Sequence, residues 1–317
     1  MNFSIRHSIE NDLVLVKLED EKTGTEIAVL PGHGASLHAF RVPLKGGLFN
    51  VIDNYHDLAE LEREMGRSFK SPKLSPFPCR IAGATYTFEG ETYTFKNGFA
   101  DGTAIHGLLY NKVFTIVGEE ADNTSASLTM EYVYEKDDPA YPHLYSCRVK
   151  YALHPGSLLE VETTVTNQGS STLPIADGWH PYFQLGGKAD DWRLQFHSAA
   201  IVEFNEQLIP TGHLLPYATF NESRPVGDTF LDNCFVLRPE ALHPAAELAN
   251  TVNGLKVSFY PDASYPYLQI YTPPSRQSIA IENLSGAPDC FNNKMGLSLL
   301  LPGHSQTFTV KYKVSVG

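Results

Sequence analysis

Long hydrophobic runs are missing from this sequence of 317 residues. A membrane-spanning helix requires about 20 consecutive apolar residues, and no stretch approaches that length. The first residues, Met1 to His7, reach charged side chains without forming the apolar core of a signal peptide. We therefore expect a cytoplasmic protein that does not associate with membranes.

Cysteine is also scarce, with four residues far apart and no Cys-x-x-Cys pair: Cys79, Cys147, Cys234 and Cys290. This spacing indicates neither a zinc site nor a dense disulfide framework. We expect reduced thiols and no bound metal, with disulfide pairing as the open alternative. A Cys-His nucleophile at Cys79 or Cys290 is conceivable, but nothing in the sequence marks a thiolate environment.

Basic residues are outnumbered, since 24 Lys and Arg stand against 36 Asp and Glu and give a formal net charge of -12. The electrostatic attraction that drives binding to a phosphate backbone would be repulsive here. The charge therefore predicts no nucleic-acid partner and favours a neutral small molecule.

The composition is that of a globular protein with a large core, because 42% of the residues are hydrophobic and 11% are aromatic. The 21 prolines and 24 glycines are spread through the chain without a low-complexity linker, and no repeat of fixed period is visible. All-β chains of this length often form one unit. We expect a single domain over residues 1–317.

Alternation of apolar and polar residues, the pattern of strands with one buried face, dominates the chain. It occurs in six segments: Leu13 to Glu19, Glu26 to Leu30, Ser127 to Tyr134, Leu158 to Thr166, Leu255 to Phe259, and Gln306 to Val314. Strands at this spacing with few helices between them favour an all-β fold with two stacked antiparallel sheets.

Two local patterns complete this prediction. Residues 86–88 and 92–95 flank Glu-Gly-Glu and predict a hairpin in which Gly90 adopts a positive φ. The segment Asp57 to Arg67 places Leu58, Leu61 and Met65 on one helical face, and Gly66 is expected to end the helix. This helix is expected to cover a sheet.

An acid and a base stand out from these strands. His180 lies in the run Asp-Gly-Trp-His-Pro-Tyr-Phe, and Glu282 follows an apolar strand-like segment and precedes turn-forming residues. At strand edges they could face opposite sides of one bound molecule and transfer two protons. The alternative is that both are hydrogen-bonded structural residues.

Three more polar positions lie beside turns at strand ends, namely Arg80, His106 and Asp232. Taken alone, Arg80 suits a surface ion pair and Asp232 suits the opening of a turn. A guanidinium also suits bidentate contact with a diol, so a binding role is the other interpretation.

In chain order these segments resemble the aldose 1-epimerase (galactose mutarotase) family over about residues 25 to 314. The matching motifs are Arg-Ile-Ala-Gly (80–83), Tyr-Thr-Phe-Glu-Gly (86–90), Ile-His-Gly (105–107), Trp-His-Pro-Tyr-Phe (179–183), Leu-Asp-Asn-Cys-Phe (231–235), Glu-Asn-Leu-Ser-Gly-Ala-Pro-Asp-Cys-Phe-Asn (282–292) and Leu-Leu-Pro-Gly-His (300–304). The segments around His180 and Glu282 are the most specific.

The resemblance implies a large antiparallel β-sandwich, the galactose mutarotase-like supersandwich, and an isomerase that interconverts sugar anomers without a cofactor. It implies that Glu282 is the general base and His180 the general acid. Arg80, His106 and Asp232 would bind sugar hydroxyls. Because sugars expose apolar C–H faces that stack on rings, we also expect at least one of Trp179, Tyr182 and Phe183 at the pocket, and Trp179 and Tyr182 are the expected substrate-binding residues.

The chemistry of a cyclic hemiacetal agrees with these roles. Ring opening removes a proton from the C1 hydroxyl and protonates the ring oxygen, so one base and one acid suffice. The ordinary pKa of a histidine, about 6.5, would let His180 donate near neutral pH.

The sequence also departs from the family pattern. Cys79 stands where many members have asparagine, and residues 108–112 replace a longer glycine-rich segment. The sugar could be glucose, galactose, another aldose or a hexose phosphate, for which only Arg80 and Lys112 offer positive charge. The remaining alternatives are a noncatalytic sugar-binding or sensing protein on the same scaffold, and either a monomer or a homodimer.

Overall fold

The alternating segments form antiparallel strands in this computed structural model, which describes residues 2–96, 101–238 and 244–317. All six predicted strands are confirmed. They are β2 (Leu13–Asp20), β3 (Thr25–Leu30), β12 (Ala126–Tyr134), β14 (Leu158–Asn167), β24 (Leu255–Pro261) and β28 (Ser305–Val316).

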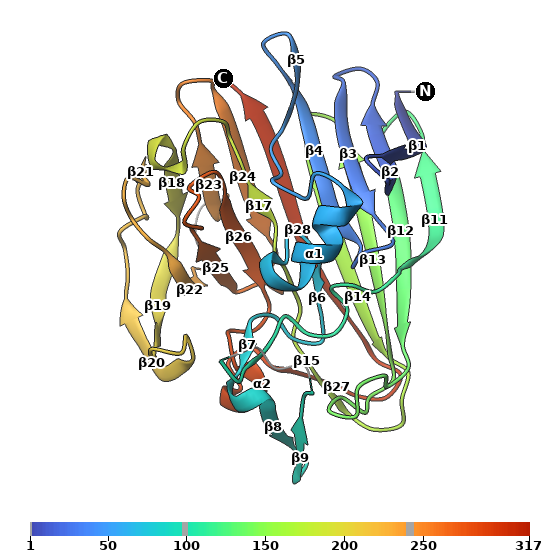
Figure 1. Ribbon diagram of the computed structural model, residues 1–317, viewed down its shortest axis with the longest axis vertical. Coiled ribbons are helices and arrows are strands. Elements are labelled where there is room, and N and C mark those ends of the chain that lie inside the picture. The colour runs from blue at the N-terminus through green and yellow to red at the C-terminus, as the bar shows by residue number, and fades with distance from the viewer. Residues whose placement is uncertain (1, 97–100, 239–243) are drawn as a thin grey trace.

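A sheet of nine strands forms one layer of the β-sandwich (Figure 1). Every second residue of β14 is buried, as expected for a strand with one face on the core. The order of the sheet is β11 (Thr115–Ala121), β12, β13 (Tyr145–His154), β14, β28, β24, β23 (Ala246–Ala249), β18 (Arg193–Phe196) and β21 (Arg224–Pro225).

Two further sheets form the opposing layer. Strands β2 and β12 contact each other across the layers, and Phe183 packs on Phe259 and Tyr312 of the nine-stranded sheet. The five-stranded sheet is β1 (Phe3–Glu10), β2, β3, β4 (Ser36–Leu44) and β5 (Gly47–Asn50). The eight-stranded sheet is β20 (Pro210–Pro216), β19 (Ser198–Phe204), β22 (Asp232–Leu237), β25 (Tyr267–Tyr271), β26 (Ile279–Leu284), β16 (Gly178–Trp179) and β6 (Lys73–Leu74), with β17 (Tyr182–Phe183) also paired to β26.

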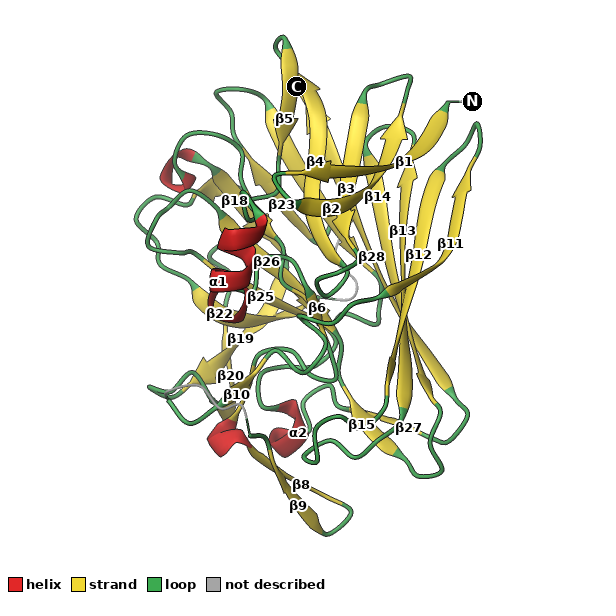
Figure 2. Cartoon of the chain, turned by 45° about the vertical axis from the view of Figure 1, so that its right-hand side comes forward, coloured by secondary structure: helices red, strands yellow, loops and turns green. Residues whose placement is uncertain are grey.

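Short elements lie at one end of the sandwich (Figure 2). The predicted hairpin is confirmed, with Glu89 and Gly90 at its tip in positive φ of 51° and 86°. These elements are β7 (Arg80–Ile81) with β10 (Ala104–Ile105), β8 (Thr85–Phe88) with β9 (Glu91–Thr94), β15 (Leu173–Ile175) with β27 (Ser298–Leu300), the 3-10 helix η1 (Ala82–Ala84) and α2 (Cys290–Asn293). A second 3-10 helix, η2 (Ala189–Asp191), precedes β18.

The predicted helix is α1 (Leu58–Ser68), which begins at the N-cap Asp57. Leu61 and Met65 are buried against β2, β3 and β4, so the helix covers one face of the five-stranded sheet. The expectation that Gly66 ends the helix is wrong. Phe69 ends it in a left-handed conformation with φ of 47°, because its buried side chain turns toward the ring of His106.

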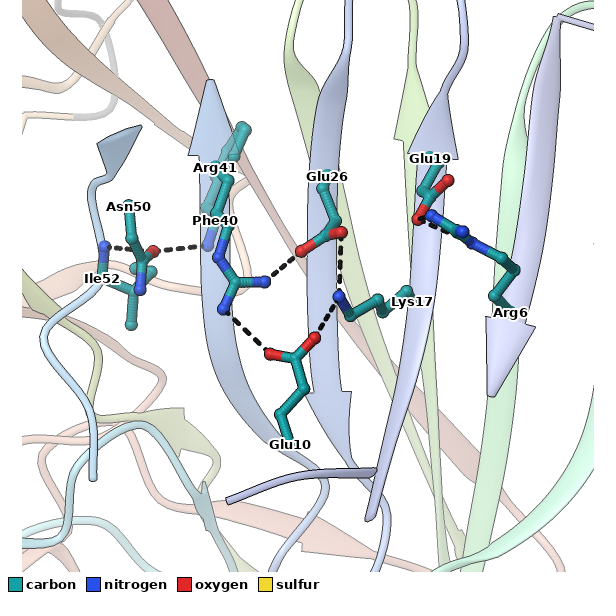
Figure 3. Close-up of polar contacts among 9 residues, drawn as sticks. All are labelled: Arg6, Glu10, Lys17, Glu19, Glu26, Phe40, Arg41, Asn50 and Ile52. Carbon is teal, nitrogen blue, oxygen red and sulfur yellow. Dashed lines mark hydrogen bonds and ion pairs between the residues drawn. The ribbon is translucent and has the colours of Figure 1, made fainter. Parts of the chain in front are cut away.

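Charged side chains on neighbouring strands of this sheet contact one another (Figure 3). Glu26 on β3 contacts Lys17 on β2 and Arg41 on β4, and Glu10 on β1 contacts the same two cations. A network that joins four neighbouring strands fixes their relative positions better than an isolated surface pair.

The four cysteines are buried and unpaired, as predicted for reduced thiols. Among the described residues, no helix is both long enough and apolar enough to cross a membrane.

Candidate active site

A cavity of about 420 Å³ opens between the end of α1, the β7 and β10 pair and the eight-stranded sheet. Of the described residues that line it, none belongs to the nine-stranded sheet. The lining consists of Arg67, Ser68, Phe69, Cys79, Arg80, Asp101, Ile105, His106, His180, Tyr182, Phe204, Leu208, Asp232, Gln269, Tyr271, Glu282 and Pro288.

Strand pairing brings the acid and the base together. Strands β16 and β17 both pair with β26, through Gly178 with Leu284 and Tyr182 with Ala280. The same register sets His180 opposite Glu282, and facing residues of antiparallel strands project to the same side. The Nε2 atom of His180 lies 3.4 Å from Oε1 of Glu282, and both side chains are buried.

His106 is held by an exchange of hydrogen bonds with Cys79. The His106 backbone N–H donates to the Cys79 carbonyl at 2.9 Å, and the Cys79 backbone N–H donates to His106 Nδ1 at 3.2 Å. Because Nδ1 accepts, the proton of the neutral ring is on Nε2. Both residues have positive φ, 61° and 54°, a strained conformation that clusters at functional sites.

The ring of His106 meets the ring of His180 edge-on, with centroids 4.9 Å apart. The ring of Phe69 also lies 4.7 Å from that of His106. The two imidazoles are therefore neighbours in one cavity, with an apolar side chain restricting their movement.

Arg80 and Asp232 line the cavity from separate strands, and each has a partner. Arg80 forms an ion pair with Asp101 at 3.4 Å, and Gln269 donates from Nε2 to Asp232 at 2.9 Å. The burial of Asp232 raises its pKa, and the positive charge of Arg80 partly opposes that shift. Gln269 pairs with Glu282 in the strand register, so these groups share one surface.

Tyr182 lines the cavity and stacks on the His180 ring with centroids 5.0 Å apart. Trp179 does not line it, which corrects the expectation that it binds sugar. Its side chain points away from that of its neighbour His180 and into the core, where it packs on Tyr151 and lies 4.2 Å from the ammonium group of Lys73.

Burial governs the electrostatics of the pair. It lowers the pKa of His180 to about 4 and raises the pKa of Glu282 well above its usual range, the latter with a further contribution from the charge of Asp232. The pKa of His180 therefore lies below the ordinary 6.5 of a histidine, because desolvation is the largest contribution. Burial therefore favours the neutral form of both groups.

Cys79, His106 and Glu282 place possible metal-ligand atoms within 4.8 Å of one another. Metal ligation requires deprotonated ligands. Burial raises the pKa of both the Cys79 thiol and the Glu282 carboxyl, and His106 carries its proton on the Nε2 atom that faces away from Cys79 N–H. This donor set suits hydrogen bonds to a polar ligand better than a cation.

Several lining residues were not predicted from the sequence, including Gln269, Tyr271, Phe204 and Leu208. They occupy ordinary strand and turn positions. Only the pairing of β25 with β26 and β22 identifies Gln269 as a neighbour of Glu282 and Asp232, and that pairing has no local signal.

Comparison with known proteins gives consistent matches along the chain. The family model described as Aldose 1-epimerase matches residues 15–313. The uncharacterized protein YihR of Escherichia coli (strain K12) is 27% identical over 247 residues, 76% of this chain and 77% of that protein. The maltose epimerase of Levilactobacillus brevis is 26% identical over 260 residues, 75% of this chain and 74% of that protein.

The fold also matches solved structures. A galactose mutarotase-like protein from Clostridium acetobutylicum superposes with a TM-score of 0.88 at 17% identity, covering 100% of this chain and 99% of that one. At this identity the likeness concerns the fold alone.

Proposed function

The chain belongs to the aldose 1-epimerase family, and from this premise we propose that it interconverts the α and β anomers of a free aldose such as glucose or galactose. The observation that supports the proposal best is the convergence of His180 and Glu282, 3.4 Å apart, on one cavity of sugar-binding size.

The reaction requires one proton to leave the sugar and one to enter it. Glu282 takes the proton of the C1 hydroxyl, His180 donates a proton to the ring oxygen, and the bond between C1 and the ring oxygen breaks. Rotation about the C1–C2 bond and the reverse transfers close the ring as the other anomer. Positioned acid and base groups each contribute on the order of 10²–10⁴ in rate.

The raised pKa of Glu282 sets a condition on these roles. Glu282 must be ionised before it can accept a proton, and Nε2 of His180, 3.4 Å away, is close enough to take the proton of a protonated Glu282. A C1 hydroxyl that donates to the carboxylate stabilises the ionised form. Over the full reaction each of the two sugar oxygens gains one proton and loses one proton. Glu282 and His180 therefore return to the protonation states in which they began.

The remaining polar groups suit the binding of hydroxyls. His106 offers an Nε2–H donor in a fixed orientation, and Arg80, which is paired with Ile105 beside it, offers a guanidinium. Asp232, oriented by Gln269, accepts hydrogen bonds. Such groups hold the pyranose ring while its C1 end reacts.

A hexose phosphate has less support. Arg80 already pairs with Asp101, and Lys112 lies outside this cavity and pairs with Asp137 at 2.9 Å. Arg67 is a further cation at the cavity, but its side chain is 75% exposed. A neutral aldose suits this charge distribution better.

Polarimetry of freshly dissolved α-D-glucose, α-D-galactose and maltose, with hexose 6-phosphates alongside, tests the proposal. Maltose is included because one relative is named for it. Glu282→Gln and His180→Asn should each lower kcat by at least about 100-fold while sugar binding persists. The surface variant Glu206→Gln should match the wild type, since Glu206 is exposed and outside the cavity.

Two results would reject the proposal that this chain is an aldose epimerase. One is an anomer exchange no faster than in buffer for every sugar. The other is calorimetric binding of sugar without any exchange and with the same affinity in Glu282→Gln, which would indicate a noncatalytic sugar-binding protein.

A further inference from the structure

A buried ion pair contacts the backbone of β16, the two-residue strand that His180 follows. We propose that Lys73 and Asp177 are positioning residues, which hold this strand so that His180 lies beside Glu282. This inference rests on the proposed function and goes beyond it, since neither Lys73 nor Asp177 lines the catalytic cavity.

The two catalytic side chains differ in how their strands are held. Glu282 lies within β26, which pairs with β25 over residues 280–284. The strand before His180 pairs with β26 only through Gly178, and with β6 through Gly178 and Trp179. The place of His180 relative to Glu282 therefore depends on further contacts of the residues just before it.

Lys73 supplies such contacts from the core of the sandwich. Its ammonium group donates to the Gly178 carbonyl at 2.9 Å and to Oδ1 of Asp177 at 2.6 Å. It also donates to Oγ1 of Thr163 at 3.3 Å, and Thr163 lies on β14 of the nine-stranded sheet. One side chain therefore joins the strand before His180 to the opposite layer.

Asp177 fixes the same segment through its side chain and its backbone. The hydroxyl group of Tyr265 donates to Oδ1 of Asp177 at 2.6 Å. The Asp177 backbone N–H donates to Oγ of Ser285 at 2.7 Å, and the Ser285 backbone N–H donates to the Asp177 carbonyl at 2.8 Å. Because Ser285 directly follows β26, these bonds tie the segment of the acid to the strand of the base.

Stability alone does not account for charges at this place. Both side chains of the pair are fully buried, and a buried ion pair is often no more stabilising than apolar residues of the same volume. The pair adds direction, because charge-assisted hydrogen bonds require a defined arrangement of their partners. Arg80 lies on β7 and His106 follows β10, so the groups that bind the sugar are held elsewhere. Loss of the ion pair should therefore slow proton transfer more than it weakens sugar binding.

The double variant Lys73→Met, Asp177→Asn removes both charges and leaves neither one unpaired. It should lower kcat by about tenfold or more while KM stays within about threefold, because small displacements of a catalytic group slow the reaction strongly. Tyr265→Phe is a milder second variant, which keeps the ion pair and removes one hydrogen bond to Asp177. It should lower kcat by about threefold or more.

Glu26→Gln is the control, since Glu26 belongs to the buried ion-pair network of the five-stranded sheet and lies outside the catalytic cavity. Its kcat should stay within about twofold of the wild type. Thermal denaturation shows whether each variant is folded. Equal losses of kcat in Glu26→Gln and in the double variant would overturn the inference, and so would an unchanged kcat in a folded double variant. If the double variant does not fold, an unchanged kcat in Tyr265→Phe overturns it.

Crystal structures of the wild type and the double variant give a readout that does not depend on turnover. The separation of His180 Nε2 and Glu282 Oε1, 3.4 Å here, should change by about 0.5 Å or more. The same separation in both structures would overturn the inference. If the wild type accelerates no anomer exchange, the proposed function fails, and this separation still decides whether Lys73 and Asp177 position His180.

Discussion

At the level of single residues, the cavity contains buried ionisable side chains at positions where apolar side chains would make the folded protein more stable. Glu282 is 2% exposed and His180 is 6% exposed, and their Oε2 and Nδ1 atoms have no hydrogen-bond partner among the described residues. Unpaired buried polar atoms destabilise a fold. Their presence at one cavity is the pattern expected where stability is given up for function.

Glu282→Gln should stabilise the protein, increasingly as the pH rises. Burial raises the folded-state pKa of Glu282 above its ordinary 4.5. Above pH 4.5 the unfolded chain releases a proton that the folded chain keeps, so wild-type stability falls with pH while the amide variant lacks this loss. The free-energy difference should grow by up to about 1.4 kcal/mol per pH unit.

Urea denaturation of both proteins at pH 5, 6, 7 and 8 measures this difference. Burial lowers the pKa of His180 to about 4, so its contribution to stability increases with pH below pH 6.5. His180 is present in both proteins, so this contribution is common to them. A stability difference that stays constant or shrinks with pH would contradict the burial argument.

Lys73 is a second buried charge, and it acts on the strand before His180. Its ammonium group lies 2.6 Å from Asp177 and 2.9 Å from the Gly178 carbonyl, with both side chains of the ion pair fully buried. Lys73→Met should destabilise the protein by about 3–5 kcal/mol, because it leaves an uncompensated carboxyl group.

The double variant Lys73→Met, Asp177→Asn should recover most of that loss, and denaturant titration of the two variants provides the measurement. Equal stabilities of the single and double variants would show that the ion pair does not explain the effect.

At the level of elements, local sequence patterns correctly predicted the features of the fold that depend on interactions between neighbouring residues. The alternating strands, the hairpin tip at Gly90 and the start of α1 at Asp57 were correct because each depends on neighbouring residues. The end of α1 was wrong because a tertiary contact of Phe69 determines it. The prediction that Trp179 lines the cavity was wrong. Trp179 lies on a two-residue strand, and the pairing of that strand determines which of its faces points to the cavity.

The loop that carries His106 should be sensitive to substitution at Gly107. A Cβ at Gly107 would lie 2.2 Å from the Ser75 carbonyl oxygen, whereas a Cβ at Gly90 meets nothing within 4 Å, and both residues have positive φ. Gly90→Ala should cost about 1–2 kcal/mol and leave activity unchanged. Gly107→Ala should cost more and lower kcat/KM by at least about tenfold.

Thermal denaturation and steady-state polarimetry of the two alanine variants test this contrast. Equal effects on kcat/KM would mean that backbone strain, and not displacement of His106, accounts for the loss.

At the level of the whole molecule, the cavity depends on contacts between distant parts of the chain. His180 and Glu282 meet through the pairing of β16 and β17 with β26, while Arg80 and His106 arrive from another pair of short strands. The sequence identified these four residues through family motifs. It could not identify Gln269, whose place depends on the order of strands in the sheet.

Activity should therefore return late in refolding. Closing long loops before non-local contacts form is slow in sheet proteins, so secondary structure should recover before catalysis. Stopped-flow circular dichroism, together with aliquots assayed for anomer exchange, would follow both signals. Activity that returns as fast as the first strand signal would contradict this order.

The nine-stranded sheet supplies none of the described residues at the catalytic cavity. Its outward face can accordingly accumulate changes under selection for solubility or for attachment to other proteins without altering substrate recognition. For engineering, that face is the place to add affinity tags, immobilisation points or consensus mutations, since none of its described residues lines the candidate active-site cavity.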